Sequence, residues 1–518
     1  MINKLLKFVA RNTDRTIFIM ALSLSVVSFI YYYDQGLITA YGDATTHLNV
    51  ARRTIDNITP GMAQLGGIWL PLLHVLMLPT IWNDFFWFSG ISGSIVSMPA
   101  FILSVLIIYK LIYFLTKDKY KAVLGSALMA LNINFLYLQT TPMTEALFVT
   151  TLISGVYLLT KWANDQRIFY LIAAAFFFFL TSINRYEGWP VALTATFVVF
   201  IISLFREGAK KAEGKILLFG TVSFFGIFLW MLWQLTIFHN AFYFLSSDFS
   251  AKGQTAIYIR QGLIPTYHNF LVSLKTNLFS LIHVLGPIAV FTAIIGLVYS
   301  TTRLIINKVY KNYITRYLPL SILFVPFVFL TYALYNGNIP MNVPETAVKG
   351  TTLTFFNVRY ALYSLPAVAI FFAILAQNRV MKILLVFLIL VNSYFLLNQG
   401  LNKIVTLRDA RESELAEIKP TYNWIRRYYD GGYILVSATI ADPLIFGTRL
   451  RMKNFITEGS GKYWTESMKN PAKYANWVIL TTSERDMVRK YMNKNAFDSN
   501  FSLVQRYDAF EIYKKNDL

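Results

Sequence analysis

The sequence lacks cysteine, and it contains few charged residues. Without cysteine, no disulfide, thiol nucleophile or thiolate metal site can form. Only 14% of its 518 residues are charged, whereas soluble domains carry about 25%. No small-residue cleavage site follows the basic N-terminal stretch KLLKFVARNTDR, so we expect the first apolar run to stay in place as an anchor. These absences exclude thiol chemistry and argue against a soluble protein.

Long apolar runs fill most of the chain, which is 56% hydrophobic. Each run is close to the roughly 20 residues that a membrane-spanning helix needs. The sequence therefore predicts an α-helical polytopic membrane protein with eleven spans, at 16–33, 85–115, 122–139, 145–160, 168–183, 189–205, 216–238, 278–300, 317–335, 360–376 and 382–398. The apolar segment 68–82 is short and contains two prolines, so we interpret it as an interfacial or re-entrant piece.

The formal net charge of +20 follows the predicted topology. If the N-terminus is cytoplasmic, the inner loops hold 19 Lys and Arg residues, and the outer loops up to residue 359 hold eight. Such an excess marks the cytoplasmic side of the cell membrane. The basic balance is thus a topology signal and requires no nucleic-acid partner.

An odd number of spans places the C-terminus outside. Residues 400–518 are polar and broken by turns, unlike the transmembrane domain predicted for 1–399. Segments 433–441, 476–482 and 502–514 have the pattern of strands, and 463–475 and 484–494 that of helices. We predict a small extracytoplasmic α/β domain.

Polar groups gather at the predicted outer ends of the spans. Carboxylates at a membrane boundary are costly and therefore candidates for function. The candidates are Asp43 and Glu145 as catalytic acids, and Arg52, Arg53, Arg185, Glu187, Arg260, His268 and Arg359 as substrate-binding residues.

Structural roles compete with some of these assignments. Glu145 follows Pro142 closely and could simply complement the dipole of a helix as a first-turn acid. Arg185 and Glu187 are two residues apart, so a structural salt bridge in a loop is an alternative to catalysis. His74 lies among apolar residues and is interpreted as a buried or interfacial histidine.

An outward cavity with carboxylates and arginines suits an anionic lipid substrate. Arginine forks bind phosphate well, and a nearby carboxylate can deprotonate an acceptor hydroxyl. Arginines also stabilise a departing lipid phosphate. This combination is typical of glycosyl transfer from a polyprenyl-phosphate sugar.

The order of spans and acids resembles the C-type (GT-C) glycosyltransferase superfamily, most closely the branch of protein O-mannosyltransferases and lipid A aminoarabinose transferases. The resemblance covers residues 16–200 best and implies that Asp43, in YGDATTHLNVARR, is the catalytic base or lies against the reacting groups. Glu145, in TTPMTEALF, matches the family's second acid, although relatives often have aspartate there. The implied partners are a polyprenyl-phosphate sugar donor and a lipid, glycan or protein acceptor.

The sequence departs from the family in three places. Asp43 has no adjacent second acid, unlike the Asp-Glu pair of the mannosyltransferases. There is no WWDxG-type motif, which argues against the oligosaccharyltransferase branch. The stretch GGIWLPLLH at 66–74 stands where aminoarabinose transferases have a charged segment. No metal is required by these residues, although Asp43, Glu145 and a histidine could together hold a divalent ion.

Two other functions compete with glycosyl transfer. A transporter or flippase of a lipid-linked or anionic solute would have broken helices in matching halves, but the sequence shows no evident duplication. An O-antigen ligase or polymerase would also use outer-loop arginines, but it would not need an acid so soon after the first span.

Overall fold

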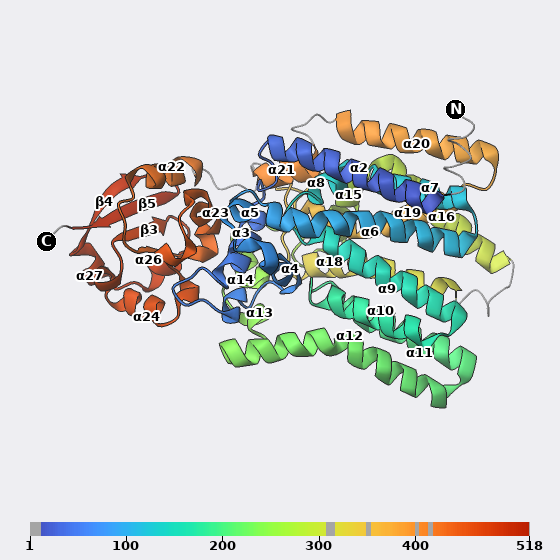
Figure 1. The fold of residues 1–518 in the computed structure, drawn as a ribbon, viewed down its shortest axis with the longest axis horizontal. Helices are drawn as coiled ribbons and strands as arrows, with labels where there is room; N and C mark the ends of the chain where they lie inside the picture. Colours follow the sequence, from blue (N-terminus) through green and yellow to red (C-terminus); the bar gives the residue numbers. More distant parts are fainter. Residues whose placement is uncertain (1–11, 307–315, 349–353, 399–403, 413–417, 517–518) are drawn as a thin grey trace. The chain divides into compact units, whose positions relative to one another are not determined.

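The computed structural model describes residues 12–306, 316–348, 354–398, 404–412 and 418–516, which fall into two compact units (Figure 1). Unit 1 comprises residues 1–35 and 96–412, and unit 2 comprises residues 36–95 and 413–518. The long loop after the first span thus groups with the C-terminal segment. The predicted domain boundary between residues 399 and 400 lies outside the described residues.

Unit 1 is built from helices within its described residues. They are α2 (Thr13–Asp34), most of α6 (Ile91–Thr116), α7 (Lys119–Ala130), α8 (Ile133–Leu138), α9 (Glu145–Asp165), α10 (Ile168–Ser182), α11 (Gly188–Glu207), α12 (Ala209–Phe238), α13 (Tyr243–Ser246), α14 (Ala251–Arg260), α15 (Phe270–Leu285), α16 (Pro287–Ile306), η2 (Leu318–Phe324), α18 (Val325–Tyr335), η3 (Val358–Ser364), α19 (Leu365–Ile374), α20 (Arg379–Asn398) and α21 (Val405–Glu412).

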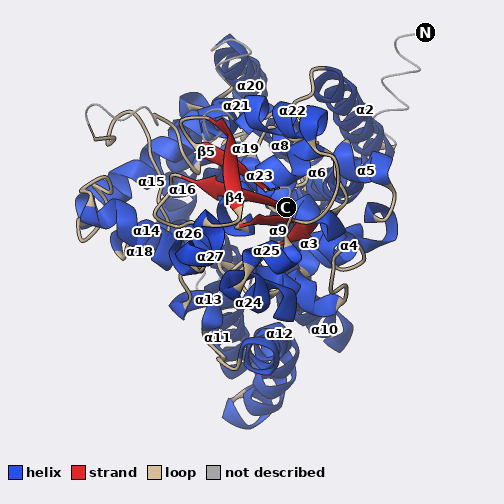
Figure 2. Ribbon diagram, turned by 90° about the vertical axis from the view of Figure 1, so that its left-hand side faces the viewer, coloured by secondary structure: helices blue, strands red, loops and turns tan. Residues whose placement is uncertain are grey.

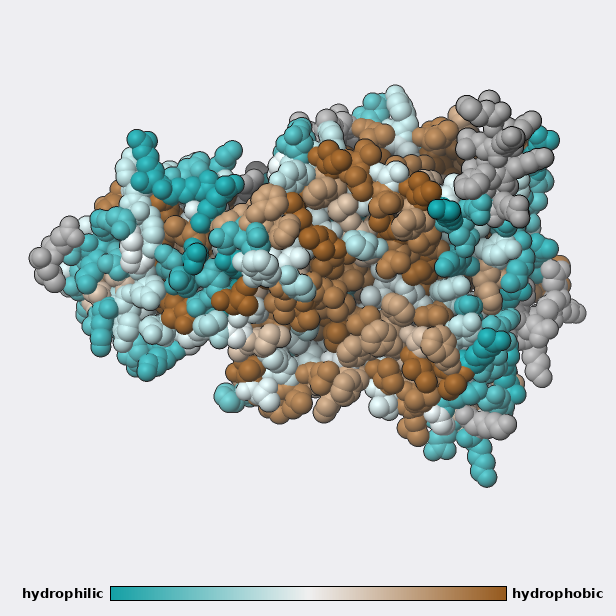
Figure 3. Space-filling view, viewed as in Figure 1, coloured by the Kyte–Doolittle hydropathy of each residue, from teal (hydrophilic) through white to brown (hydrophobic). Residues whose placement is uncertain are grey.

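Eight helical segments of the described chain are long and apolar enough to cross a membrane: α2, α6, α9, α11, residues 212–238 of α12, α16, η2 with α18, and α20. Shorter apolar helices occur at α10, α15 and η3 with α19. In Figure 3, hydrophobic residues form a brown area over the helices of unit 1, and teal residues gather where α6 ends. The prediction of a mostly helical, multi-pass membrane protein is confirmed.

The predicted single span at 278–300 is wrong, because the helix breaks at Gly286. Gly286 has a positive φ of 90°, and a Cβ there would meet Asn392 Oδ1 at 2.1 Å. Asn392 Nδ2 donates to the Leu285 carbonyl at 3.0 Å, and Asn392 Oδ1 accepts from the Ala289 N–H at 3.1 Å. The side chain of Asn392 thereby satisfies backbone groups that the break between α15 and α16 leaves unpaired.

The predicted span at 122–139 is likewise two helices, α7 and α8. Asn132 separates them and caps α8, because its Oδ1 accepts from the Phe135 N–H at 2.9 Å. Asn132 Nδ2 also donates to the Val284 carbonyl at 3.0 Å. Hydropathy alone does not detect this interruption, since the flanking residues are apolar on both sides.

Unit 2 contains short helices and one sheet. Its elements are α3 (Gly42–Arg53), η1 (Met62–Leu65), α4 (Leu72–Ile81), α5 (Asp84–Phe88), α22 (Ile418–Tyr428), β1 (Ile434–Val436), α23 (Ala438–Thr448), η5 (Met452–Asn454), β2 (Phe455–Ile456), η6 (Glu458–Ser460), α24 (Lys462–Lys469), α25 (Pro471–Tyr474), β3 (Trp477–Thr481), α26 (Met487–Tyr491), α27 (Lys494–Asp498), β4 (Phe501–Arg506) and β5 (Phe510–Lys515). Helix α4 has only ten residues, as expected for a piece that does not span.

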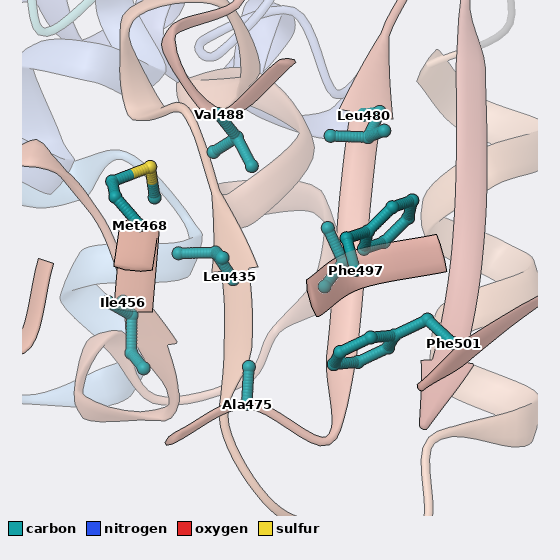
Figure 4. Close-up of a cluster of buried hydrophobic side chains, with 9 residues drawn as sticks. Leu435, Ile456, Met468, Ala475, Leu480, Val488, Phe497 and Phe501 are labelled. Carbon is teal, nitrogen blue, oxygen red and sulfur yellow. The ribbon is translucent and has the colours of Figure 1, made fainter. Parts of the chain in front are cut away.

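The strands form a single five-stranded mixed sheet in the order β2-β1-β3-β5-β4, drawn in red in Figure 2. β1 is parallel to β2 and β3, whereas β5 is antiparallel to β3 and β4. Buried apolar side chains pack on the sheet, among them Leu435, Ile456, Leu480, Phe497 and Phe501 (Figure 4). The predicted small α/β domain is confirmed, with the strand predicted at 502–514 folded as the β4–β5 hairpin.

Candidate active-site residues

Glu145 begins α9 in unit 1 and is fully buried. Its Oε1 accepts a hydrogen bond from Arg359 Nε at 3.1 Å, and Arg185 Nη1 lies 3.8 Å from the same oxygen. Its first-turn position also places the carboxylate at the positive end of the helix dipole. Glu145 therefore complements the dipole of α9, as the structural alternative predicted, and it also contacts Arg359 and Arg185.

The loop between α10 and α11 supplies Arg185 and Glu187. The loop is tight, and α11 starts directly after it at Gly188. Only glycine fits there, because a Cβ would lie 2.3 Å from the Thr181 carbonyl oxygen. Arg185 Nε and Nη2 donate to the two oxygens of Glu187 at 3.2 and 3.0 Å. Arg185 Nη1 donates to Thr144 Oγ1 at 2.8 Å. The salt bridge weighed from the sequence is thus a bidentate pair directly beside Glu145.

Arg359 comes from η3 and is held between two acids. Asn357 precedes it with a φ of 56°, a left-handed conformation that asparagine tolerates. The Asn357 N–H donates to Asp409 Oδ1 at 3.0 Å, and Arg359 Nη1 lies 3.8 Å from Asp409 Oδ2. Asp409 belongs to α21 and is fully buried. Glu145 and Asp409 therefore flank the same guanidinium.

We call Glu145, Arg185, Glu187, Arg359 and Asp409 the Glu145 cluster. Its three carboxylates and two guanidiniums give a formal charge of −1 in a buried setting. Glu145 Oε2 has no hydrogen-bond partner among the described residues. The cluster therefore has an excess of acceptor capacity, which a hydroxyl group or a proton would satisfy.

Two further buried polar atoms near the cluster lack hydrogen-bond partners in the described chain. They are Asn184 Oδ1 and the hydroxyl of Tyr363. Asn184 Nδ2 donates to the Thr144 carbonyl at 3.3 Å, and the Tyr363 ring lies 5.2 Å from the Arg185 guanidinium carbon. These atoms add hydrogen-bonding capacity around Arg185 of the Glu145 cluster and around Thr144, which contacts Arg185.

Arg260 and His268, also in unit 1, do not join the Glu145 cluster. Arg260 is the last residue of α14 and is exposed, and no carboxylate pairs with it in the described part of the chain. His268 is exposed with a φ of 53°, and its ring packs beside Tyr267 and Tyr335. Arg260 is consequently a guanidinium available to an anion.

In unit 2, Asp43 lies in the first turn of α3 and is partly buried. His47 follows four residues later, on the same face of the helix. His47 Nδ1 lies 2.8 Å from His74 Nε2, and the His47 ring lies 4.2 Å from the ring of Trp69. His74 is fully buried, and burial, followed by the charges of His47 and Arg53, lowers its pKa well below 6.5. The sequence interpretation of His74 as a buried histidine agrees with this geometry.

Arg52 ties the end of α3 to the segment after α4. It donates to Asp56 at 3.0 Å, to Asp84 at 2.6 Å and to the carbonyls of Ile81 and Trp82. All three of its nitrogen groups are thereby engaged within unit 2. Through these contacts Arg52 fixes the end of α3 within unit 2. The role of Arg52 in binding substrate stays a prediction.

Helix α23 of the C-terminal segment packs on α3. Asn49 Nδ2 donates to the backbone carbonyl of Asp442 at 2.9 Å and to Asp442 Oδ1 at 3.3 Å. Arg53 Nη1 lies 3.7 Å from Asp442 Oδ2. Gly42, next to Asp43, lies against Pro443 of α23: a Cβ at position 42 would be 3.5 Å from Pro443 Cγ. The C-terminal segment therefore orients the helix that carries Asp43.

Sequence reasoning missed Asp409, Asn49 and Asp442. Asp409 lies in the polar stretch predicted to belong to the extracytoplasmic α/β domain, and Asp442 directly follows the strand predicted at 433–441. Their importance depends on contacts across 52 or more residues, which no local pattern reveals. Among the described residues, no group of three or more His, Asp or Glu could hold a metal ion, and the divalent ion stays a prediction.

Comparison with known proteins identifies the fold. No family model and no curated protein matches the sequence. Among solved structures, ArnT from Cupriavidus metallidurans bound to undecaprenyl phosphate is similar at a TM-score of 0.50 and 9% identity, covering 94% of this chain and 97% of that one. The oligosaccharyltransferase of Archaeoglobus fulgidus in complex with zinc and sulfate gives a TM-score of 0.49 at 13% identity, covering 90% and 68%. The chain thus shares the fold of GT-C membrane glycosyltransferases.

Proposed function

We propose that this protein is a glycosyltransferase that moves a sugar from a polyprenyl-phosphate donor to an acceptor hydroxyl. The observation that carries the proposal is the Glu145 cluster, whose buried carboxylate has one oxygen without a hydrogen-bond partner in the described chain. The cluster occurs in a fold similar to that of ArnT, which was solved with undecaprenyl phosphate. Lipid, glycan and protein are all possible acceptors.

In the proposed reaction, the acceptor oxygen forms a bond to the anomeric carbon while the bond from that carbon to the lipid phosphate breaks. Asp43 takes the proton of the acceptor hydroxyl as general base. Glu145 accepts a hydrogen bond from a substrate hydroxyl through Oε2. The departing polyprenyl phosphate carries away the bonding electrons, so positive groups near it lower the barrier.

The arginines divide into two groups in this proposal. Arg185 and Arg359 are engaged by carboxylates of the Glu145 cluster, and they position Glu145. Arg260 is exposed and has no carboxylate partner among the described residues. We therefore assign the contact with the lipid phosphate to Arg260 first, with His268 as a second candidate.

The experiment is transfer of a radiolabelled sugar from a polyprenyl-phosphate donor pool by the purified full chain. We expect Asp43→Asn to lower transfer about 100- to 10,000-fold, the usual contribution of a general base. Glu145→Gln should lower transfer about 10- to 150-fold, because the substrate hydroxyl loses a hydrogen bond to a charged group. Glu145→Gln makes the cluster formally neutral and should fold. Glu466→Gln, an acid at an exposed position of α24, is the matched control and should keep full activity. Full transfer by both folded variants would overturn the proposal.

The proposed orientation has the N-terminus in the cytoplasm and the C-terminal segment on the extracytoplasmic side of the cell membrane. The chain contains no cysteine, so a single introduced thiol can be labelled without background. Asp43→Cys and Glu466→Cys should react with a membrane-impermeant maleimide from outside. Labelling of either from the cytoplasmic side alone would contradict this orientation.

A further inference from the structure

A cavity of about 700 Å³ lies within unit 1, and its described lining includes no residue of the Glu145 cluster. It is bounded by the end of α6, the start of α7, the last turns of α16, the start of η2 and the end of α19. From the start of α7 the chain runs through α7 and α8 to reach Glu145. Lys121, which lines the cavity, and Glu145 thus lie at opposite ends of the segment formed by α7 and α8.

The cavity wall combines apolar side chains with hydroxyl groups. Its apolar side chains include Leu297, Leu304, Leu318, Phe324 and Phe371. Its hydroxyl groups come from Thr116, Tyr299, Ser300, Thr301, Tyr317 and Ser321. Such a wall matches a molecule with an apolar chain and a polar head.

The charges at the cavity are positive. Lys121 and Arg303 line it, and none of its described lining residues is acidic. Asp118 is nearby, but it pairs with Lys382 at 3.0 Å and caps α7 by accepting from the Tyr120 N–H at 2.8 Å. Within the described chain, neither Lys121 nor Arg303 has a carboxylate within 4 Å. Asp118 is thus the one acid beside the cations Lys121, Arg303 and Lys382 in the described chain, so the cavity attracts anions.

The neighbouring surface is that of a membrane-facing helix. On α16, Val298, Ile305 and Ile306 are 57%, 67% and 71% exposed. A soluble phosphate would pair with Lys121 and Arg303 but leave the apolar wall in contact with water. A lipid would pair with the two cations through its phosphate and cover the apolar wall with its acyl chain. We propose that the cavity binds an anionic glycerophospholipid, with its phosphate at Lys121 and Arg303 and an acyl chain along the apolar wall.

This site is independent of the proposed glycosyl transfer. The lipid would be a constituent of the surrounding bilayer, because basic residues at the end of a span attract anionic head groups. It would hold together α7, α16 and α19, which all contribute lining residues. The predicted consequence is retention of anionic lipid by the purified protein.

The test is native mass spectrometry of the purified full chain titrated with phosphatidylglycerol, phosphatidylcholine or soluble glycerol phosphate. We expect phosphatidylglycerol to bind selectively. Lys121→Gln combined with Arg303→Gln should weaken its binding roughly 30-fold, from about 1 kcal/mol per basic residue. Lys119→Gln with Arg379→Gln is the matched control, since both residues are exposed at the same end and do not line the cavity.

A second variant guards against misfolding. Arg303 is exposed, so Arg303→Glu should fold while placing a carboxylate at the phosphate position. We expect it to lose phosphatidylglycerol selectivity. The proposal is overturned if phosphatidylcholine binds equally well, if glycerol phosphate competes fully, or if both Arg303 variants bind lipid like the control.

Discussion

The two units hold their candidate acids in different ways. In unit 1, Glu145 belongs to a buried group of five charges that pair with one another. In unit 2, Asp43 lies on a helix whose middle is fixed by amide hydrogen bonds and a histidine pair, and whose last turn is fixed by ion pairs of Arg52 and Arg53. The comparison shows that ion pairs hold Glu145 itself, whereas neutral groups hold the middle of α3 and ion pairs hold its last turn.

This difference has an energetic consequence. Removing one partner of a buried ion pair leaves a charge without compensation. Removing one partner of a neutral hydrogen bond leaves a dipole, which costs less. Substitutions in the Glu145 cluster should therefore destabilise the protein more than substitutions of the neutral groups around α3.

The largest effect is expected for Arg359→Gln. Glu145 and Asp409 would lose the guanidinium between them, and we expect a loss of about 3–5 kcal/mol in the free energy of unfolding. Thermal unfolding of the detergent-solubilised chain measures it. Adding Glu145→Gln to Arg359→Gln should recover part of the loss, because it removes one of the stranded charges.

A surface pair provides the control for this prediction. Arg408 pairs with Glu412 but is 40% exposed, so Arg408→Gln should cost at most about 1 kcal/mol. If Arg359→Gln and Arg408→Gln lower stability equally, the ion pairs of the Glu145 cluster do not carry its geometry.

The sequence predicted the elements of the fold better than the contacts of the site. Long apolar runs gave the helices and the polar C-terminal segment gave the sheet, because hydropathy and periodicity act locally. The break at Gly286 depends on Asn392, more than 100 residues away, and was missed. Glu145, Arg185, Glu187 and Arg359 were singled out because charges are rare in apolar surroundings. Their pairing with Asp409 required the folded chain.

An intermediate effect is expected for Asp442→Ala in unit 2. The change removes the carboxylate beside Arg53 and one acceptor of Asn49, although the backbone carbonyl of residue 442 still accepts from Asn49. We expect a loss of about 1–3 kcal/mol, the penalty for unsatisfied buried groups. Protection of α3 amides against hydrogen exchange would report the change locally.

Asp442→Asn is the matched variant for this position. Burial raises the pKa of Asp442 above 3.8, with Glu458 adding to the rise and Arg53 and Asn49 opposing it. Since the folded state holds this proton more tightly, stability falls as pH rises from 3.8 through the raised pKa. Asp442→Asn should lack this slope and lie close to wild type at pH 7. A loss as large as that of Asp442→Ala would show that the carboxylate charge itself is required.

The smallest effect is a pH dependence from His74. Burial, then His47 and Arg53, lowers the pKa of His74 well below 6.5, so the folded state keeps it neutral while the unfolded state takes up a proton. Its contribution to stability is therefore complete above 6.5 and is lost as pH falls through the lowered pKa, by at most about 1.4 kcal/mol per pH unit. Thermal unfolding between about pH 7.5 and about pH 5, on either side of the ordinary histidine pKa, measures the slope. His74→Gln should flatten it, because an amide does not titrate. The control variant His268→Gln, in unit 1, should keep the slope that His74 causes. An unchanged slope in His74→Gln would mean that the acid sensitivity arises outside the histidine pair. The contact between His74 and His47 would then not be one of the neutral interactions that stabilise α3.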